Sequence, residues 1–139
     1  MTQRIKAGAV IFASDVARLA TFYERLAGMV PAGEEDGAVF LENDALQLVI
    51  HPLPPGVAEQ VAVVPPTAPR WRSAVKLVLP VDSLARVRAQ AAALGGGLKE
   101  ASAAFTCRDF RACDGHDPEG NIIQFREALA PGEGPSPAA

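Results

Sequence analysis

The sequence repeats one pattern of apolar, capping and turn residues in its two halves, at a spacing of 68 positions. The segment VIFASDVARL (10–19) aligns with VLPVDSLARV (78–87), and LAGMV (26–30) aligns with LGGGL (94–98). In each half this order predicts a strand, a helix and three further strands. A unit of this size buries too little apolar surface alone, so the halves are expected to pair within a single domain, residues 1–130.

The first module is predicted to span residues 4–52. Its β-branched run AGAVIFA favours a buried strand, and Ser14 and Asp15 are caps for a helical pattern that Gly28 ends. The expected elements are a strand at 7–13, a helix after Asp15, an edge strand with its loop at 29–36, and hairpin strands at 37–43 and 45–52.

The second module, residues 72–128, follows a proline-rich linker at 53–71, which cannot form regular helix or a central strand. Asp82 and Ser83 are predicted helix caps. The expected elements are a strand at 73–81, a helix at 84–94 that ends at three glycines, and strands at 98–106, 107–114 and 121–127. The tail at 131–139 is expected to be disordered.

Composition argues against several classes of partner. The net charge of −3 gives no basic surface for phosphate backbones, so no nucleic acid is expected. No apolar run reaches the roughly 20 residues that span a bilayer, so no membrane is expected. Two cysteines are too few for a disulfide framework, which predicts a cytoplasmic, reduced protein. Cys107 and Cys113 fall in one predicted strand, on one face, as small packing residues.

The duplicated β-α-β-β-β pattern resembles the vicinal oxygen chelate superfamily, which includes glyoxalase I, bleomycin-resistance proteins and extradiol dioxygenases. The likeness depends on SDVARLATFYE (14–24) after the first strand and DPEGNIIQF (117–125) at the last, and it covers about residues 4–128. The resemblance implies an α+β fold in which two such modules form a curved mixed sheet around a cleft. It also implies a homodimer.

In metal-using members of that superfamily, the resemblance implies a histidine on the first strand and a glutamate on the last strand of each module. Those positions fall on Gly8, Lys76, Gln47 and Gln124 in this sequence. Glycine has no donor, a protonated lysine has no lone pair, and glutamine lacks the charge of a carboxylate. We therefore expect no metal and no cofactor. Gly8 is expected to leave extra room where a histidine ring would project.

Strand alternation places Gln47, Val49 and His51 on the face of the expected ligand site, and Gln124 on the matching face of the second module. An apolar pocket with two amides and one ammonium suits a small organic ligand with a polar or anionic group. The predicted ligand-binding residues are Gly8, Gln47, Val49, His51, Trp71, Lys76 and Gln124.

Simpler interpretations stay open for these residues. The two glutamines suit a solvated sheet face equally well, and Lys76 can extend along the sheet to solvent. Trp71 is either a wall or lid of the site or an anchor for the linker. A metal site at His116 with Asp114 and Asp117 is a minority alternative, because three neighbouring turn residues rarely satisfy tetrahedral geometry.

The function predicted from these features is metal-independent binding of a small organic molecule, similar to the bleomycin-resistance proteins. The alternative is a glyoxalase-like lyase or isomerase, or a dioxygenase, with a displaced metal site or a metal-free base. A scaffold subunit without a ligand is a third possibility. A shared fold does not decide among these three.

Overall fold

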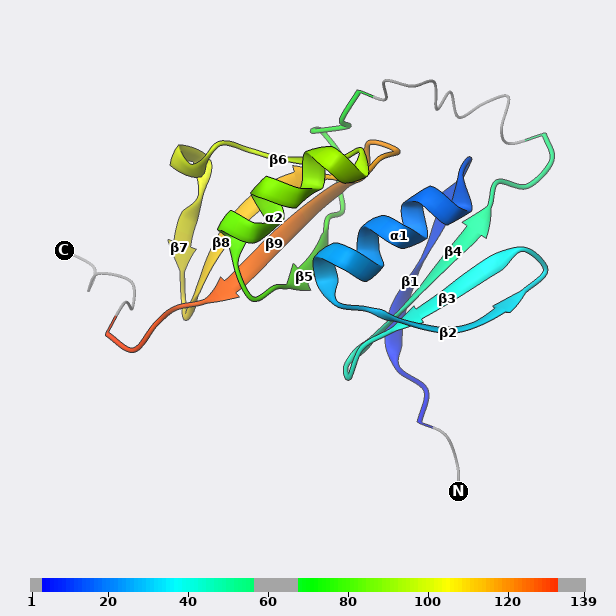
Figure 1. Ribbon diagram of the computed structural model, residues 1–139, viewed down its shortest axis with the longest axis horizontal. Coiled ribbons are helices and arrows are strands. Elements are labelled where there is room, and N and C mark those ends of the chain that lie inside the picture. Colours follow the sequence, from blue (N-terminus) through cyan, green and yellow to red (C-terminus); the bar gives the residue numbers. More distant parts are fainter. Residues whose placement is uncertain (1–3, 57–67, 133–139) are drawn as a thin grey trace. The chain divides into compact units, whose positions relative to one another are not determined.

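The computed structural model describes residues 4–56 and 68–132, and the chain divides into two compact units, the first up to Thr67 and the second from Ala68 (Figure 1). The predicted disordered tail lies almost wholly outside the described residues, as does most of the linker. The first unit consists of β1 (Ala7–Ala13), α1 (Val16–Ala27), β2 (Val30–Glu35), β3 (Ala38–Glu42) and β4 (Leu46–Pro52). The second consists of β5 (Leu77–Pro80), α2 (Leu84–Ala91), η1 (Ala92–Leu94), β6 (Gly97–Leu98), η2 (Ala101–Ala103), β7 (Phe105–Cys107), β8 (Phe110–His116) and β9 (Ile122–Ala128).

The first unit has a mixed sheet in the order β1-β4-β3-β2, in which β1 and β4 are parallel and the other pairs are antiparallel. Helix α1 begins because the Asp15 side chain accepts a hydrogen bond from the Arg18 amide, and it ends at Gly28 with a φ of 62°. The helix packs on β3 and β4. Its buried apolar face consists of Leu19, Ala20, Phe22, Tyr23 and Leu26.

The second unit repeats this plan with the order β5-β9-β8-β6, in which β5 and β9 are parallel and β7 also pairs with β8. Ser83 caps α2 by accepting from the Arg86 amide, and Glu127 accepts from the Leu84 amide over 2.8 Å. Gly95, with a φ of 90°, ends the 3-10 turn η1 that extends this helix. Helix α2 packs on β6 and β9.

The predicted α+β fold of two β-α-β-β-β modules is confirmed, and each module has its own mixed sheet. The predicted strand at 98–106 is wrong, because η2 interrupts it and leaves the short strands β6 and β7. The predicted strand at 107–114 is also wrong. A two-residue turn divides it, in which Arg108 takes a φ of 52°, an uncommon value for a residue other than glycine.

The same turn corrects the prediction for the two cysteines. Cys107 ends β7 and is exposed, whereas Cys113 lies in β8 and is buried. They therefore share neither a strand nor a face. The Cys113 thiol lies 3.6 Å from the Lys99 carbonyl oxygen, to which it donates a weak hydrogen bond.

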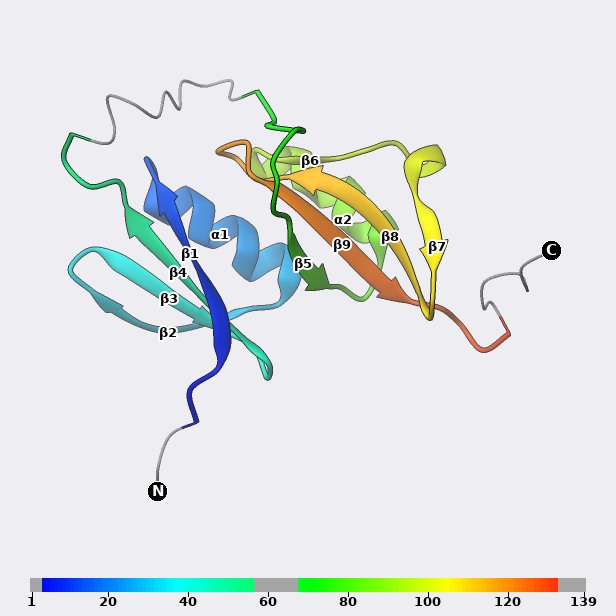
Figure 2. The same ribbon diagram turned by 180° about the vertical axis from the view of Figure 1, so that it is seen from behind.

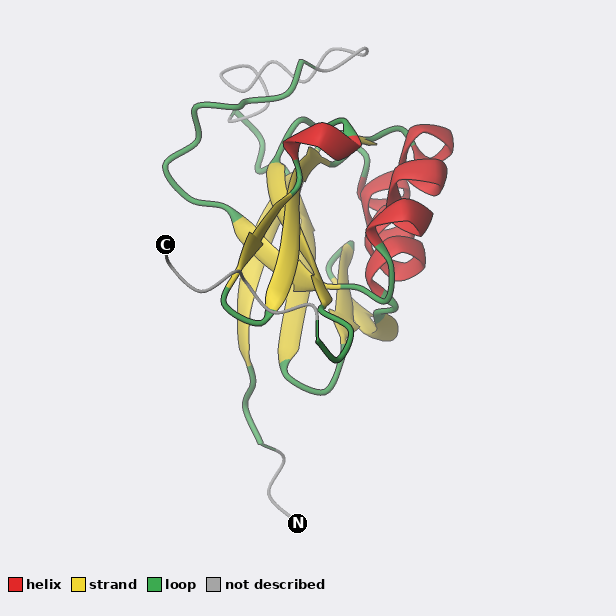
Figure 3. Ribbon diagram, turned by 90° about the vertical axis from the view of Figure 1, so that its left-hand side faces the viewer, coloured by secondary structure: helices red, strands yellow, loops and turns green. Residues whose placement is uncertain are grey.

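Each helix covers one face of the sheet in its own unit and leaves the opposite face without a helix. In Figure 3 each helix lies along one side of the strands of its own unit, and Figure 2 shows the strands of each unit with their own helix behind them. In the first unit this helix-free face carries Val10 and Phe12, which are 55% and 50% exposed. In the second unit it carries Val78, which is 38% exposed. The helix-free face of each unit thus exposes apolar side chains that a ligand or partner can contact.

The turn between β8 and β9 depends on one buried carboxylate. Asp117 is completely buried, and its Oδ1 accepts hydrogen bonds from the amides of Glu119 and Asn121 over 2.9 and 3.0 Å. Its Oδ2 accepts from the Asn121 side-chain amide over 2.8 Å. The carboxylate therefore fixes the turn that leads into the strand of Gln124.

We expect Asp117→Ala to lower the free energy of unfolding by about 2–4 kcal/mol, because it leaves buried amide donors without an acceptor. Urea unfolding followed by circular dichroism measures this change. Asp44→Ala, at an exposed turn of the first unit, is the matched control and should change stability little. Equal stability of the two variants would contradict this role for Asp117.

Candidate functional site on the helix-free faces

Gly8 and Gln47 are direct neighbours on the parallel strands β1 and β4. A Cβ atom at Gly8 would lie 2.1 Å from the Gln47 carbonyl oxygen, well inside van der Waals contact. The prediction that Gly8 leaves extra room is therefore wrong, because the backbone of Gln47 occupies the space that a side chain would need. A histidine at this position would require one of the two strands to move.

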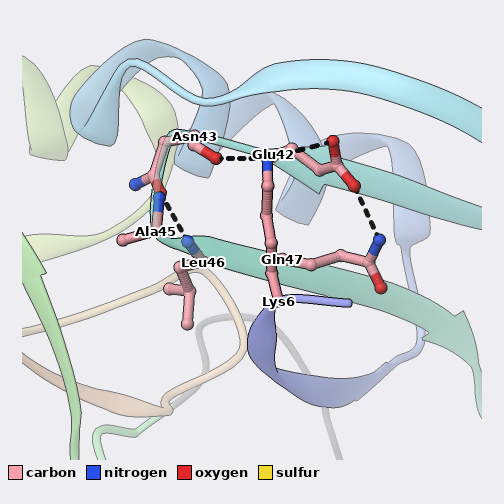
Figure 4. A network of polar contacts seen from close by, with 6 residues as sticks. All are labelled: Lys6, Glu42, Asn43, Ala45, Leu46 and Gln47. Atoms are coloured by element: carbon pink, nitrogen blue, oxygen red, sulfur yellow. Dashed lines mark hydrogen bonds and ion pairs between the residues drawn. The ribbon is translucent and has the colours of Figure 1, made fainter. Parts of the chain in front are cut away.

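Gln47 joins a polar network with Glu42 and Lys6 (Figure 4). Its Nε2 donates to Glu42 Oε1 over 2.7 Å, and Lys6 Nζ lies 3.4 Å from Glu42 Oε2. The same ammonium donates to the Asn43 carbonyl oxygen over 2.8 Å. The hydrogen bond from Gln47 is the main cause that holds the pKa of Glu42 below its ordinary value of 4.5, and the charge of Lys6 adds to it.

The local turn explains why these groups meet. The Asn43 side-chain oxygen accepts from the amides of Ala45 and Leu46 over 3.0 and 2.8 Å, which closes the β3–β4 hairpin. This register places Glu42 directly opposite Gln47. A hollow of about 370 Å³ opens beside the network and is lined by Arg4, Ile5, Lys6, Glu42 and Gln47.

Val49 and His51 follow Gln47 on the same face of β4, as strand alternation predicted. His51 Nδ1 lies 2.7 Å from the Pro52 carbonyl oxygen, so this nitrogen carries the hydrogen. Its ring also contacts Phe12 edge to face, with the ring centroids 5.5 Å apart. In the tautomer that carries its hydrogen on Nδ1, Nε2 is the acceptor of this half-buried side chain.

A second network occupies the helix-free face of the second unit. Lys76 Nζ donates to Asp114 Oδ2 over 2.7 Å, and Gln124 Nε2 donates to Asp114 Oδ1 over 3.3 Å. Gln124 Oε1 in turn accepts from Arg126 Nε over 2.8 Å. Gln124 is only 8% exposed, so both ends of its amide are fixed in a buried position.

The two networks contain the same three kinds of group in the same register. Each glutamine lies opposite a carboxylate, Glu42 in the first unit and Asp114 in the second. Each carboxylate also pairs with a lysine near the start of the first strand of its unit. The chain therefore builds one lysine–carboxylate–glutamine triad per module, Lys6–Glu42–Gln47 and Lys76–Asp114–Gln124.

Strand register also corrects the predicted correspondence between the modules. The helix caps Asp15 and Ser83 keep the spacing of 68 residues, but the strand partners of the two glutamines, Gly8 and Val78, are 70 apart. The connection from first strand to helix is two residues shorter in the second unit. When the two modules are aligned on Gln47 and Gln124, Val78 is the counterpart of Gly8, and Lys76 is the counterpart of Lys6.

The ligand positions that the resemblance implies do not fit a divalent metal ion. They supply two amides and no carboxylate, and the nearest carboxylates are paired with lysine ammonium groups where a cation would bind. Within residues 4–56 and 68–132, no group of three or more histidine, cysteine or acidic side chains could hold a metal. At the alternative His116 site, Asp114 bonds Lys76 while both Asp117 oxygens bond the turn.

Trp71 lies against the last residue of β8, where the turn into β9 begins. Its ring meets the His116 ring edge to face at 6.1 Å, and Lys99 Nζ lies 4.6 Å from its centroid. The preceding Arg70 donates from its backbone amide to the Gly120 carbonyl oxygen and from Nη1 to the Glu119 carbonyl oxygen. These contacts favour the interpretation of Trp71 as an anchor for the linker.

The predicted residues thus form two groups. One contains Gly8, Gln47, Val49 and His51, and the other contains Lys76 and Gln124. That they line a shared cleft stays a prediction. Sequence reasoning missed Lys6 and Glu42, although the predicted hairpin at Asn43 contained the signal: it places Glu42 opposite Gln47.

No helix in the described part of the chain is long and apolar enough to cross a membrane.

The family model described as a glyoxalase-like domain matches residues 8–125. A search of curated protein sequences gives no match. Among solved structures, a glyoxalase/bleomycin resistance protein from Albidiferax ferrireducens is 21% identical with a TM-score of 0.64, over 88% of this chain and 98% of that chain. A glyoxalase/bleomycin resistance protein/dioxygenase family enzyme from Burkholderia phytofirmans is 16% identical with a TM-score of 0.64, over the same shares.

The fosfomycin resistance protein FosX from Mesorhizobium loti is also similar in structure. It is 11% identical with a TM-score of 0.61, over 94% of this chain and 97% of that chain. At these identities the similarity to solved structures establishes a shared fold, and it does not establish a shared activity.

We expect Gln47→Leu to raise the pKa of Glu42 towards its ordinary value, because the main hydrogen bond that favours the carboxylate is lost. The folded-state pKa is lowered, so the ionised group adds stability above pH 4.5 that is lost as the pH falls through the folded-state pKa. The advantage of the parent chain over the variant should therefore shrink in acid. An NMR titration of the side-chain carboxyl carbons of aspartate and glutamate measures the pKa of Glu42 in the parent chain and in the variant.

Asp82 is an internal control for this titration. The hydrogen bond from Arg86 lowers the pKa of Asp82 in the second unit, and this pKa should not change in Gln47→Leu. An unchanged pKa of Glu42 in the variant would contradict the network in Figure 4.

Proposed function

Because the chain belongs to the glyoxalase-like domain family, we propose that it binds a small organic molecule on the helix-free faces of its sheets and that this binding needs no metal ion. The observation that carries the proposal is the pattern of these faces. Each combines a fixed lysine–carboxylate–glutamine triad with exposed apolar residues on the first strand of the same module. Such a mixture of apolar surface and few oriented polar groups is typical of small-molecule sites.

The triads support a binding role more than a solvated surface. Gln124 is buried with both ends of its amide bonded, and the Asp114 side chain is only 15% exposed. Holding polar groups in this way orients them in advance and lowers the entropy lost on binding. The lysine ammonium groups balance the carboxylates, which removes the need for a cation. A homodimer and a cytoplasmic location remain part of this proposal.

We expect the purified protein to contain less than about a tenth of an equivalent of any transition metal when these metals are supplied during growth. A screen of small aromatic and aliphatic molecules by NMR should shift the amides of Gln47, Val49, His51, Lys76 and Gln124, equally with and without EDTA. Stoichiometric metal, or binding that EDTA abolishes, would contradict the metal-free part of the proposal. Shifts confined to α1 and α2 would contradict the location.

His51 supports a second candidate, a metal-free base in a lyase or isomerase. Its Nδ1 hydrogen bond to Pro52 leaves Nε2 free to accept a proton, next to the apolar ring of Phe12. A base of this kind removes a proton from the carbon next to a carbonyl group.

For this candidate we expect deuterium exchange at such a carbon in D₂O that survives EDTA and is lost in His51→Gln. His116→Gln, at the other histidine of the chain, is the matched control and should keep the activity. Exchange that is absent from the parent protein, or unchanged in His51→Gln, rules out the base.

A further inference from the structure

The helix-free faces of the two modules differ in charge next to the glutamine of each triad. Two residues after Gln124 stands Arg126, whereas two residues after Gln47 stands Val49. Four residues before Asp114 stands Phe110, whereas four residues before Glu42 stands Ala38. Arg126 and Phe110 contact each other, with the guanidinium carbon 4.1 Å from the ring centroid. The repeated triad has therefore gained an arginine–aromatic pair in the second unit alone.

The guanidinium of Arg126 is held in place before any ligand arrives. Its Nε donates to Gln124 Oε1, and its guanidinium carbon lies over the ring of Phe110. Among the described residues neither Nη group has an acceptor, and none of the ion pairs includes Arg126. The adjacent Glu127 accepts hydrogen bonds from Leu84 and Arg111 instead. A half-buried cation without an anion is costly unless it acquires one.

The charges of the network indicate which anion fits. Lys76 neutralises Asp114, so the chain of four groups from Lys76 to Arg126 keeps one net positive charge. The two free Nη groups of a guanidinium match the two oxygens of a planar carboxylate. A doubly charged phosphate group would lack a second counter-charge here.

The residues beside Arg126 indicate what the rest of the ligand resembles. On the parallel strand β5, Val78 pairs with Gln124 and Pro80 pairs with Arg126. Both are exposed, and Val78 belongs to the same face as the glutamine. The apolar body of a ligand can therefore lie over β5 while its charged end reaches the guanidinium.

We infer that Arg126 is the anion-binding residue of the second module and that the ligand is a small apolar monocarboxylate. Its carboxylate accepts hydrogen bonds from the two Nη groups, and its body covers Val78 and Pro80. This inference rests on the proposed small-molecule binding and adds the charge and chemical class of the molecule.

Benzoate, benzamide and phenylphosphonate test this inference, because they share a ring and differ in charge and geometry. In an NMR titration of the whole chain, benzoate should shift the resonances of Val78, Gln124 and Arg126 in a saturable way and bind more tightly than the other two. In Arg126→Met, benzoate affinity should fall about tenfold or more, because charge-assisted hydrogen bonds are lost. Arg126→Lys should fall between the two, since it keeps the charge without the two-pronged geometry.

Arg111→Met is the matched control, because Arg111 lies on β8 and pairs with Glu127. It should bind benzoate as the parent protein does. The inference is overturned if Arg126→Met binds benzoate unchanged, if benzamide or phenylphosphonate binds as well as benzoate, or if benzoate gives no saturable shifts. If the NMR screen of small molecules still finds a neutral molecule that binds, the proposed function stands although this inference has failed. The failure of the inference is thus distinguishable from the failure of the proposed function.

Discussion

The parallel pairing of the first and last strands in each unit is the constraint from which the rest of the structure follows. Parallel neighbours cannot be joined by a tight turn, so a helix and antiparallel strands intervene between β1 and β4, and between β5 and β9. The helix packs on one face of the sheet and leaves the other uncovered. The same pairing brings a lysine from near the start of the first strand to the carboxylate that faces the glutamine of the last strand, which explains why the triad occurs twice.

In each triad a lysine ammonium neutralises the charge of the carboxylate. A partly buried carboxylate needs a partner of opposite charge, and the Lys76 ammonium lies 2.7 Å from Asp114. A metal ion would have to displace that lysine and then bind a glutamine oxygen without charge. The close approach of Gly8 to the Gln47 carbonyl oxygen adds a steric reason, since no ligating side chain fits there. Charge pairing in the second unit and close packing in the first therefore both oppose a metal site at these positions.

Local signals in the sequence were enough for elements whose ends are set by single residues. Asp15, Gly28 and Ser83 were predicted as caps or stops, and α1 and α2 begin or end at them. The region 98–114 could not be predicted, because η2 and the positive φ of Arg108 depend on the packing around them. The faces of β4 and β9 followed from alternation. The triads did not, because they require the exact register between strands that are far apart in sequence.

The difference between the two faces argues that the duplicated modules have separate roles. In the first unit, Val49 stands two residues after the glutamine of the triad, and Phe12 contacts His51 edge to face. In the second unit, the same position holds Arg126, whose guanidinium lies over the Phe110 ring and has no carboxylate partner among the described residues. Symmetric triads alone would give both faces similar chemistry. Because the exception is a charged group held by two contacts, it is more costly to keep than an apolar residue, and that cost is best explained by an anion that binds to it.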